Sequence, residues 1–358
     1  YRGRAGQPCH GGSAGEERAV ATDRLRVGII GAGGIARGVH LPSLAEMQDV
    51  RMVAICDLVA DRAEKLAKQF SIERIYVSFH EMLAKESLDA VFVLVEPANL
   101  FHVVWYALNA KVHVFMEKPP GISAMQARSL ERKAMEVGRF LQVGFNRRHI
   151  PAVRRAVEMV RAKGTINQVD GTFVKFGDAA FDHGSLSAFA SDTIHAIDLV
   201  RWVAGGTPTA AALVAASYEG VVDSAWNGVV RFDNGVTGTV RANYKTGGRV
   251  HRLDVHAPGA SAYIDLGMGE EIACSATILT HEGEARYSLA AAGAAAEKVQ
   301  RLDGLELAGS KQFHAFYGYY QEDRHFLDCV QGKGKPDPDI ADAAKTIELV
   351  ELLLAHRI

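Results

Sequence analysis

The chain has 358 residues, of which 48% are hydrophobic and 23% are charged, and its formal net charge is −2. This composition is typical of a globular protein, and the absence of blocks of like charge argues against a nucleic-acid or membrane-surface partner. No apolar run approaches the roughly 18 residues that a membrane span requires. Because the chain is too long for one ordinary hydrophobic core, we expect two domains.

The cysteines and histidines show no metal-binding or disulfide pattern. Cys9, Cys56, Cys274 and Cys329 are scattered and form no C-x-x-C pair, which predicts free thiols in a reducing compartment such as the cytoplasm. The 14 histidines lack metal-ligand spacing, so no metal is expected. Residues 1–24 contain no apolar segment, which predicts a disordered extension in place of a secretory signal.

A glycine-rich loop follows the first apolar run, Leu25–Ile30. We expect Gly31 to make the tight turn that leaves a strand, and Gly33 to let a pyrophosphate approach the backbone. Ala36 takes the place of the third glycine, and the helix that follows would direct its free N–H groups at the phosphates. The loop residues expected to contact a cofactor are Gly31, Gly33, Gly34, Ile35 and Ala36.

Asp57 ends the second apolar run, Met52–Cys56, roughly twenty residues after the loop. A carboxylate there accepts hydrogen bonds from ribose hydroxyls, so the strand, loop, helix and acid together predict dinucleotide binding. The alternative is a glycine-rich turn in another α/β sheet. Asp57 favours NAD as the cofactor, while Arg62 leaves NADP open.

Helices and strands then alternate as far as residue 146. Helices are expected at 61–70, 81–85, 101–109 and 123–137, and strands at 75–77, 90–95, 112–116 and 140–145. Ser123 is expected to cap the last of these helices and Gly138 to end it. The alternation predicts a doubly wound parallel sheet with helices on both faces, so residues 25–146 are interpreted as a Rossmann NAD(P)-binding domain.

Strands dominate the remainder, which predicts an α+β substrate-binding domain over residues 147–358. A helix at 152–162 is expected before strands at 168–176, 211–219, 228–232, 236–244 and 252–256. The turn Asp233-Asn-Gly235 predicts a hairpin and therefore an antiparallel sheet. Residues 283–312 show no clear period and are predicted as loop with some helix. The amphipathic final helix, 339–356, must pack on something, and one candidate is the N-terminal domain.

The predicted strand at 112–116 is followed by Glu117-Lys118-Pro119-Pro120-Gly121. Ligands of a doubly wound sheet bind beyond the carboxyl ends of its strands, so Glu117 and Lys118 are expected to face the cofactor crevice. The alternative is a surface ion pair before a proline-rich turn.

With the loop Gly31-Ala-Gly-Gly-Ile-Ala36, the sequence Glu117-Lys118-Pro119 resembles the glucose–fructose oxidoreductase, inositol dehydrogenase and MocA family. The resemblance runs from Leu25 to the last helix and includes Gly144-Phe-Asn-Arg-Arg148 and the stretch 326–332. It implies a Rossmann domain followed by a domain with a large, mostly antiparallel open sheet. It also implies that Lys118 touches both the nicotinamide side and the substrate hydroxyl.

The sequence Ser191-Asp192-Thr-Ile-His195 carries the second group of polar residues. Ser191 or Asp192 is expected to cap a helix that runs to Ala204, which would place Asp192 and His195 on one side of its first turn. A histidine beside an acid at a helix N-terminus is a candidate base, and a structural histidine is the alternative. By resemblance, His195 matches the acid–base histidine of the family. The acid usually found four residues earlier is Ser191 here, so Asp192 is its candidate replacement.

Further candidates are less specific. The segment Glu96-Pro97-Ala-Asn-Leu-Phe-His102 departs from the Thr-Pro-Asn-x-x-His sequence that the resemblance implies. Pro97 and His102 are expected to line the nicotinamide end, with a helix cap as the alternative for His102. Arg147 and Tyr244 are candidates for polyol contacts or for structural roles.

The sequence therefore predicts an NAD(P)-dependent oxidoreductase that transfers a hydride between nicotinamide and a hydroxyl-bearing carbon of a sugar, cyclitol or related polyol. The alternative is a non-catalytic dinucleotide-binding sensor or regulatory protein of the same fold. A homodimer or homotetramer formed through the C-terminal sheet is also predicted, because Val229, Val240 and Val255 are expected to need burial on its open face.

Overall fold

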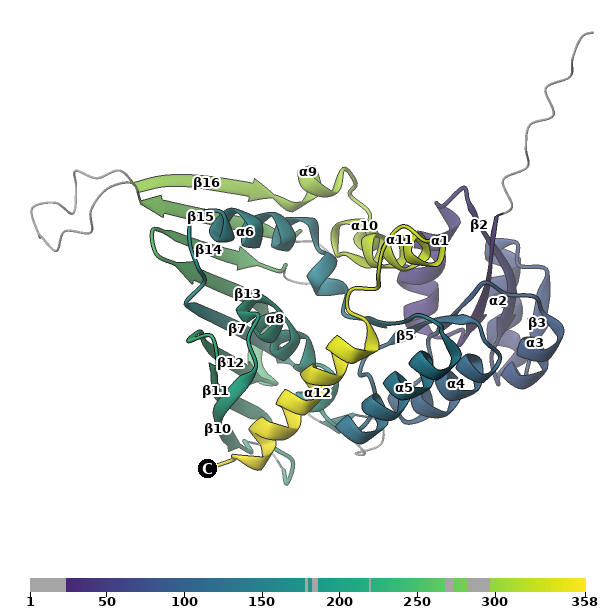
Figure 1. Cartoon of the computed structure of the whole chain (residues 1–358), viewed down its shortest axis with the longest axis horizontal. Coiled ribbons are helices and arrows are strands. Elements are labelled where there is room, and N and C mark those ends of the chain that lie inside the picture. The colour runs from purple at the N-terminus through teal and green to yellow at the C-terminus, as the bar shows by residue number, and fades with distance from the viewer. Residues whose placement is uncertain (1–23, 178–179, 182–185, 219, 268–272, 282–296) are drawn as a thin grey trace, which may run out of the picture.

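The computed structural model describes residues 24–177, 180–181, 186–218, 220–267, 273–281 and 297–358. The extension predicted for residues 1–24 lies almost wholly outside this part of the chain, as does the first half of the predicted loop 283–312. Two large sheets lie side by side, with helices around the first and against one face of the second (Figure 1). Within the described residues, no helix is long and apolar enough to cross a membrane.

The first sheet has six parallel strands, and the predicted strands are confirmed to within a few residues. In spatial order they are β3 (Arg74–Tyr76), β2 (Val50–Cys56), β1 (Leu25–Ile30), β4 (Ala90–Val93), β5 (His113–Glu117) and β6 (Leu141–Gly144). The strand order reverses between β1 and β4, as in a doubly wound sheet. The carboxyl ends of all six strands therefore form one edge, where a ligand can be bound.

Helices cover both faces of this sheet, as the sequence predicted. The helices that follow its strands are α1 (Leu41–Ala45), α2 (Ala60–Phe70), α3 (Phe79–Lys85), α4 (Pro97–Asn109) and α5 (Ala124–Val137). Ser123 caps α5 by accepting the N–H of Gln126, and Gly138 ends it in the left-handed conformation, so both predicted signals are confirmed. One hydrophobic cluster lies on the α4 and α5 side, and another lies on the α1 and α2 side.

A helix from the C-terminal half completes the second cluster. In α11 (Tyr319–Val330), the ring of Phe326 lies 5.6 Å from that of Phe92 and 5.9 Å from that of Phe115, measured between centroids. As a result, a helix from the far end of the chain packs against β4 and β5. This helix was not predicted from the sequence.

The second sheet has eight strands and is antiparallel except between β12 and β7. In spatial order they are β10 (Pro208–Ala216), β11 (Ala225–Phe232), β12 (Thr237–Asn243), β7 (Gln168–Phe176), β13 (Lys245–Ala257), β14 (Ala260–Asp265), β15 (Ser275–His281) and β16 (Glu297–Asp303). The hairpin at Asp233–Gly235 is confirmed, with a positive φ of 86° at Gly235.

Over the described second half of 283–312, the expected helix is present as α9 (Gly304–Ala308), whereas the prediction of loop is wrong where β16 lies. β16 is an edge strand with exposed Lys298, Val299 and Gln300, so no buried face imposes an alternating pattern on its sequence. β14 and β15 were not predicted from the sequence either.

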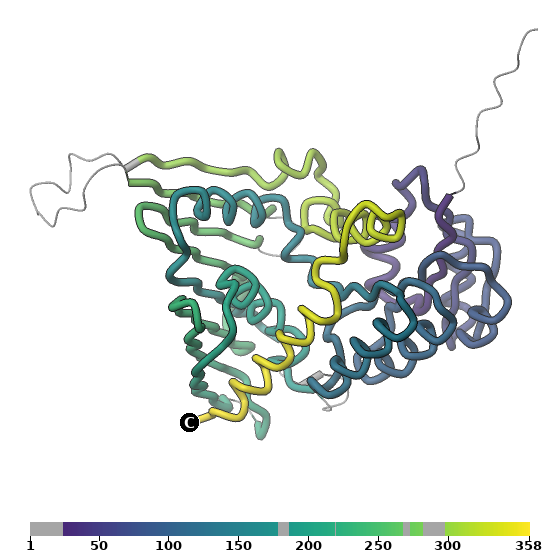
Figure 2. The backbone as a smooth tube through the Cα atoms, viewed as in Figure 1, coloured from purple at the N-terminus to yellow at the C-terminus, as the bar shows by residue number. Residues whose placement is uncertain are grey.

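One face of the second sheet is packed against helices α6 (Pro151–Arg161), α8 (Ile194–Ala204) and α12 (Ile340–Ala355). Figure 2 shows α12 running from between the sheets, along the second sheet, to the C-terminus. This helix also contacts α5, where Arg128 Nε donates to Glu348 Oε1 over 2.6 Å.

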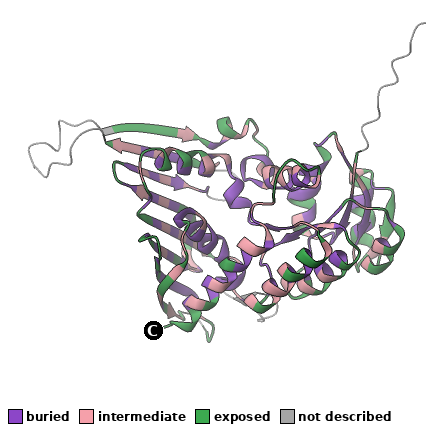
Figure 3. Cartoon of the chain, in the orientation of Figure 1, coloured by how far each residue is buried: buried purple, intermediate pink, exposed green. Residues whose placement is uncertain are grey.

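The burial pattern corrects one expectation (Figure 3). Val240 and Val255 are 1% and 0% exposed, because they lie on the face that the helices of this chain cover. The expectation that these two residues need a second subunit for burial is therefore wrong. Val229 lies on the opposite face and is 54% exposed.

Candidate active site

The glycine loop turns at the carboxyl end of β1. Gly31 has a φ of 106°, and a Cβ added to it would lie 2.4 Å from the carbonyl oxygen of Leu94. Only glycine fits there, because a side chain would meet this backbone and strain the turn. In contrast, a Cβ added to Gly33 or Gly34 would meet nothing within 4 Å. The backbone of these two glycines is therefore open to a ligand.

Beyond the loop, the chain forms η1 (Ala36–His40), a short π-helix that continues into α1. Ala36 is fully buried in the core beneath, so its small side chain lets this helix lie close to the sheet. A hollow of about 520 Å³ lies over the loop. Its lining residues are Ala32, Gly33, Gly34, Ile35, Arg37, Arg62, Leu94, Val95 and Glu96.

Asp57 lies beside this hollow at the end of β2. Its Oδ2 accepts a 2.8 Å hydrogen bond from the N–H of Ala32, and its Oδ1 accepts one of 2.8 Å from the N–H of Val59. The glycine loop thus helps to hold the carboxylate that is expected to bind the ribose hydroxyls. Pro97 is the first residue of α4 and follows Glu96, which lines the hollow. His102 lies further along α4, and its ring is edge-on to that of Tyr106, with 5.0 Å between the centroids.

Lys118 leaves the carboxyl edge of the sheet toward the second domain. It follows Glu117, the last residue of β5, which pairs with Gly144 of β6. The Lys118 Nζ donates a 3.0 Å hydrogen bond to the backbone carbonyl of Ser191. Glu117 is turned inward instead, because its Oε1 lies 3.1 Å from His40 Nε2 and its Oε2 accepts the N–H of Lys118 over 3.1 Å.

The structure corrects the predicted helix start at 191–192. Ser191 ends a separate short helix, α7 (Ala188–Ser191), and its hydroxyl donates to the carbonyl of Ser187 over 2.9 Å. α8 begins at Ile194 with Thr193 as the N-cap residue, and no side chain caps it. Neither predicted cap is made, because the Asp192 carboxylate bonds to groups of the second sheet.

Asp192 forms a cluster with Lys175 of β7 and with Tyr244, which lies between β12 and β13. Its Oδ2 accepts a 2.7 Å hydrogen bond from the Tyr244 hydroxyl and lies 2.6 Å from Lys175 Nζ. Burial raises the pKa of this carboxyl, but the positive charges of Lys175, Lys118 and Arg147 outweigh it and hold the pKa well below its ordinary value. Asp192 is therefore ionised, and it fixes the ammonium of Lys175 at this site.

His195 lies on the first turn of α8 and is 6% exposed. Burial lowers the pKa of its imidazole well below 6.5, and the charges of Arg147 and Lys118 lower it further, against the opposing effect of Asp192. The ring is consequently neutral at pH 7. Its Nδ1 has no hydrogen-bond partner among the described residues, and the Phe145 ring lies edge-on to it at 6.0 Å.

Lys175 and His251 were not candidates in the sequence analysis, although strand alternation contains the signal. Lys175 lies on the same face of β7 as the buried residues Val169, Gly171 and Phe173, because alternate residues of a strand share one face. A lysine on the buried face of a strand is unusual and marks the end of the apolar core. His251 pairs with Phe173 in the register of β7 and β13, and the two rings stack at 4.1 Å.

Arg147, three residues beyond β6, reaches the same place from the junction between the two domains. It is 5% exposed, its guanidinium carbon lies 4.2 Å from the centre of the Phe173 ring, and its Nη1 lies 2.9 Å from His251 Nδ1. Groups from both domains therefore surround one point at the carboxyl edge of the first sheet. They are Lys118, Arg147, Lys175, Asp192, His195, Tyr244 and His251.

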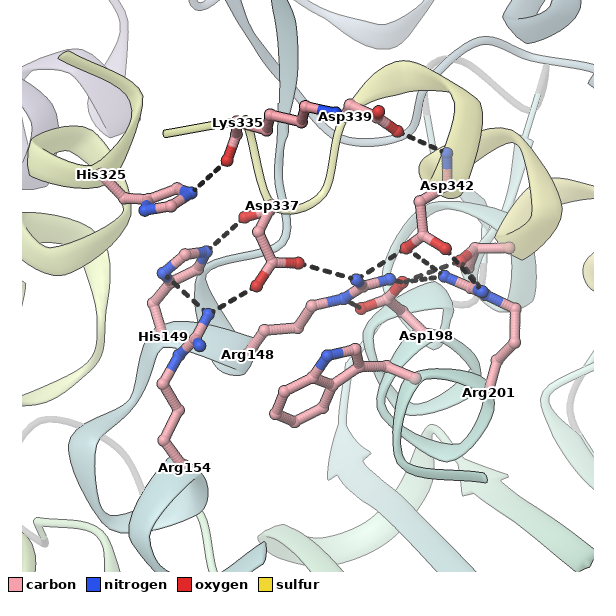
Figure 4. Close-up of polar contacts among 12 residues, drawn as sticks. Arg148, His149, Arg154, Asp198, Arg201, His325, Lys335, Asp337, Asp339 and Asp342 are labelled. Carbon is pink, nitrogen blue, oxygen red and sulfur yellow. Dashed lines mark hydrogen bonds and ion pairs between the residues drawn. The ribbon is translucent and has the colours of Figure 1, made fainter. Parts of the chain in front are cut away.

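An ion-pair network holds α8, and with it His195, in this position (Figure 4). Arg148 is buried and donates to Asp198 of α8 through Nε over 2.6 Å and through Nη2 over 2.5 Å. It also donates to Asp342 of α12 over 2.7 Å, and Arg201 of α8 donates to the same carboxylate over 2.6 Å. The network ties the junction after β6 to α8 and α12.

The profile described as "Oxidoreductase family, NAD-binding Rossmann fold" matches residues 25–145, and the "GFO/IDH/MocA C-terminal domain" profile matches residues 153–263. The chain belongs to the GFO/IDH/MocA oxidoreductase family. It is thus an enzyme of an NAD-binding family, and the resemblance seen in its sequence is confirmed.

Named relatives of this GFO/IDH/MocA chain include the uncharacterized oxidoreductase YrbE of Bacillus subtilis, which is 28% identical over 68% of this chain and 74% of its own length. Myo-inositol 2-dehydrogenase of Thermotoga maritima is 28% identical over 51% of this chain and 55% of its own length. D-glucoside 3-dehydrogenase of Escherichia coli is 31% identical over 42% of this chain and 43% of its own length. The matches to these two dehydrogenases thus span only about half of either protein.

Solved structures of similar fold cover nearly the whole GFO/IDH/MocA chain. GenD2 from gentamicin A biosynthesis, in complex with NAD, has a TM-score of 0.75 at 22% identity and covers 93% of this chain and 94% of its own. A dehydrogenase from Chromobacterium violaceum has a TM-score of 0.79 at 22% identity, covering 94% and 95%. At these identities the likeness shows the fold.

The residues of the glycine loop after β1 fit the NAD that the family binds. The open backbone at Gly33 and Gly34 leaves room for a pyrophosphate, and the start of η1 offers it free N–H groups. Asp57, at the end of β2, has the charge and position that favour ribose hydroxyls over a 2′-phosphate. Arg37 and Arg62 complete the lining of the hollow.

Proposed function

We propose that this enzyme oxidises a hydroxyl-bearing carbon of a sugar, a cyclitol or a related polyol, or reduces the matching carbonyl, with NAD as the hydride carrier. The observation that carries the proposal is the convergence of Lys118 from the first domain with Asp192 and His195 from the second. The names of two relatives, myo-inositol 2-dehydrogenase and D-glucoside 3-dehydrogenase, support this substrate class.

His195 is the proposed base. A neutral imidazole has one unprotonated ring nitrogen, which can take the hydroxyl proton as the hydride departs. The C–H bond breaks with its electron pair, the O–H bond breaks with its proton passing to His195, and a carbon–oxygen double bond forms. NAD, when bound, supplies the acceptor for the hydride.

Lys118 and Asp192 position and stabilise the reacting oxygen in this proposal. The ammonium of Lys118 is held at the cleft by the Ser191 carbonyl, where it can donate to the same hydroxyl and stabilise negative charge developing on it. Asp192, which is ionised, orients Lys175 and the Tyr244 hydroxyl and stabilises a positive charge that forms on His195.

The direct test is a spectrophotometric assay of NAD reduction by the purified protein against a panel of polyols and sugars. Turnover that is lost in His195→Ala would support the proposal. The rival function, a non-catalytic dinucleotide-binding sensor, predicts NAD binding without turnover of any compound in either direction. No observation in the structure favours that rival.

We propose that the protein is a cytoplasmic homo-oligomer. The described cysteines Cys56, Cys274 and Cys329 are buried free thiols, as a reducing compartment allows. The open face of the second sheet carries the exposed Val229 among polar residues, and a second copy related by a two-fold axis could cover it.

A further inference from the structure

Two arginines lie together at the substrate end of the second sheet without acidic partners. Arg147 Nη1 donates to His251 Nδ1 over 2.9 Å, and Arg249 Nη2 donates to the Tyr317 hydroxyl over 3.1 Å and lies 3.4 Å from the same His251 nitrogen. The Nε atoms of both arginines are buried and lack a hydrogen-bond partner among the described residues. Among the described residues, no carboxylate forms an ion pair with either guanidinium.

His251 cannot neutralise them. Burial lowers the pKa of its imidazole far below the ordinary value, and the charges of Arg147 and Arg249 lower it further. Its ring is therefore neutral and only accepts hydrogen bonds from the arginines through Nδ1. The carboxylate of Asp192, whose pKa Arg147 helps to lower, is already bonded to Lys175 and Tyr244.

Such an arrangement is costly unless something compensates for it. A buried cation without an anionic partner loses its hydration and gains no Coulombic attraction in return. Arg147 is 5% exposed and approaches the aromatic faces of Phe173 and Tyr317, which compensate only in part. The site consequently has an excess of positive charge where a substrate would lie.

The cofactor phosphates are too far away to supply the missing anion. The pyrophosphate site lies over the loop after β1, whereas Arg147 follows β6, and β4 and β5 lie between these strands. Three strand spacings amount to about 14 Å, well beyond the length of an ion pair. Neither the carboxylates of the described residues nor the cofactor phosphates pair with these arginines, so a bound substrate could supply the anion.

We propose that the substrate is a sugar or cyclitol that carries an anionic group, a carboxylate or a phosphate, and that Arg147 and Arg249 bind this group. The proposal rests on the proposed function, because it names the substrate class of the same site. Guanidinium groups bind both kinds of anion through paired N–H donors, so their fork geometry suits either source. Lys118 and His195 would then act on a hydroxyl of the same molecule.

The test compares matched compounds in two measurements. NAD-loaded protein is titrated calorimetrically with glucose, glucuronate and glucose 6-phosphate, and with myo-inositol and its monophosphate, and each compound is then assayed for NAD reduction. We expect at least one anionic compound to bind about tenfold or more tightly than its neutral counterpart. The glucuronate and phosphate arms distinguish a carboxylate from a phosphate as the recognised group.

Variants locate the recognition. Arg249→Gln, in a partly exposed residue that is less critical for folding than Arg147, should reduce the preference for the anion by about tenfold, and Arg249→Lys should restore part of it. Arg252→Gln is the matched control, because Arg252 pairs with Asp254 on the opposite face of β13 and should leave the preference unchanged.

Equal affinity for neutral and anionic compounds, or a preference that survives in Arg249→Gln, would overturn the inference. Failure of every anionic compound to bind the NAD-loaded protein would also overturn it. Turnover of neutral polyols without any preference for anions would leave the proposed function standing. Anion binding without hydride transfer would support this inference and count against the proposed function.

Discussion

The ammonium of Lys118 donates a hydrogen bond to the backbone carbonyl of Ser191 across 3.0 Å, and this contact joins the two domains at the reacting centre. Lys118 directly follows β5 of the first sheet, and Ser191 ends α7, three residues before the start of α8. The contact holds the ammonium near the start of α8, where His195 lies, so that one substrate hydroxyl could contact both side chains.

We expect Lys118→Ala and His195→Ala each to lower kcat by about a hundredfold or more, because each removes a group that handles the charge or proton of the hydroxyl. NAD affinity should change little in His195→Ala. His256→Ala, on the open face of β13, is the control and should retain activity. Steady-state kinetics and NAD titration measure these effects. A His195→Ala enzyme with the original rate and pH profile would show that this histidine is structural.

Asp57→Ser should narrow or reverse a preference for NAD over NADP. A carboxylate at the end of β2 repels a 2′-phosphate, whereas a serine hydroxyl can donate to it, and Arg62 lies in the same hollow. Fluorescence titration with NADH and NADPH measures both affinities. Asp61→Ser, an exposed acid in the first turn of α2, is the control. Clearly tighter binding of NADPH by the parent protein would contradict this prediction.

The buried Glu322 should make folding stability fall as pH rises. Burial raises the pKa of this carboxyl well above 4.5, and the neighbouring Asp323 raises it further, so the folded state retains a proton that the unfolded state releases. Stability is therefore full below pH 4.5 and is lost progressively as pH rises through the folded pKa.

Glu322→Gln removes this titration without changing the size of the side chain. Urea unfolding at several pH values should show a shallower loss of stability for the variant than for the parent between about pH 5 and 8. The residual slope above pH 6.5 is expected from His40, whose pKa is also raised because Asp323 and Glu117 outweigh its burial. Glu81→Gln, in the exposed pair with Lys85, should keep the parent slope. Equal slopes for Glu322→Gln and the parent would exclude this role for Glu322.

Asp198→Ala should destabilise the protein by about 3–5 kcal/mol, because it leaves the guanidinium of Arg148 buried without its main partner. Both side chains of this pair are 1% exposed. The matched exposed pair is Arg252 with Asp254, where Asp254→Ala should cost less than about 1 kcal/mol. Denaturant unfolding provides the comparison. Similar losses in the two variants would mean that the network of Figure 4 does not anchor α8.

The open face of the second sheet predicts an oligomer, which light scattering after size exclusion can measure. We expect a mass at least twice that of the 38.7 kDa chain. Val229→Glu should lower it, because it places a charge on the outer face of β11. Val221→Glu changes a fully exposed loop residue and should not. A parent mass near that of one chain would count against the oligomer.

The sequence by itself determined the features that depend on local backbone conformation and on the period of apolar residues. Gly31 and Gly235 occupy positive φ, Ser123 and Gly138 bound α5, and strand alternation indicated both sheets. These signals can be read because each involves residues that are close in the chain. The same holds for the glycine loop and Asp57, whose separation is set by one strand–helix–strand unit.

Only the tertiary structure decided which side chains meet. Asp192 does not cap α8, because Lys175 of β7 and Tyr244, between β12 and β13, bind its carboxylate. Arg147, three residues after β6, meets His251 of β13. Such contacts join residues far apart in sequence, and their energies depend on burial and charge that exist only after the sheets and helices have packed.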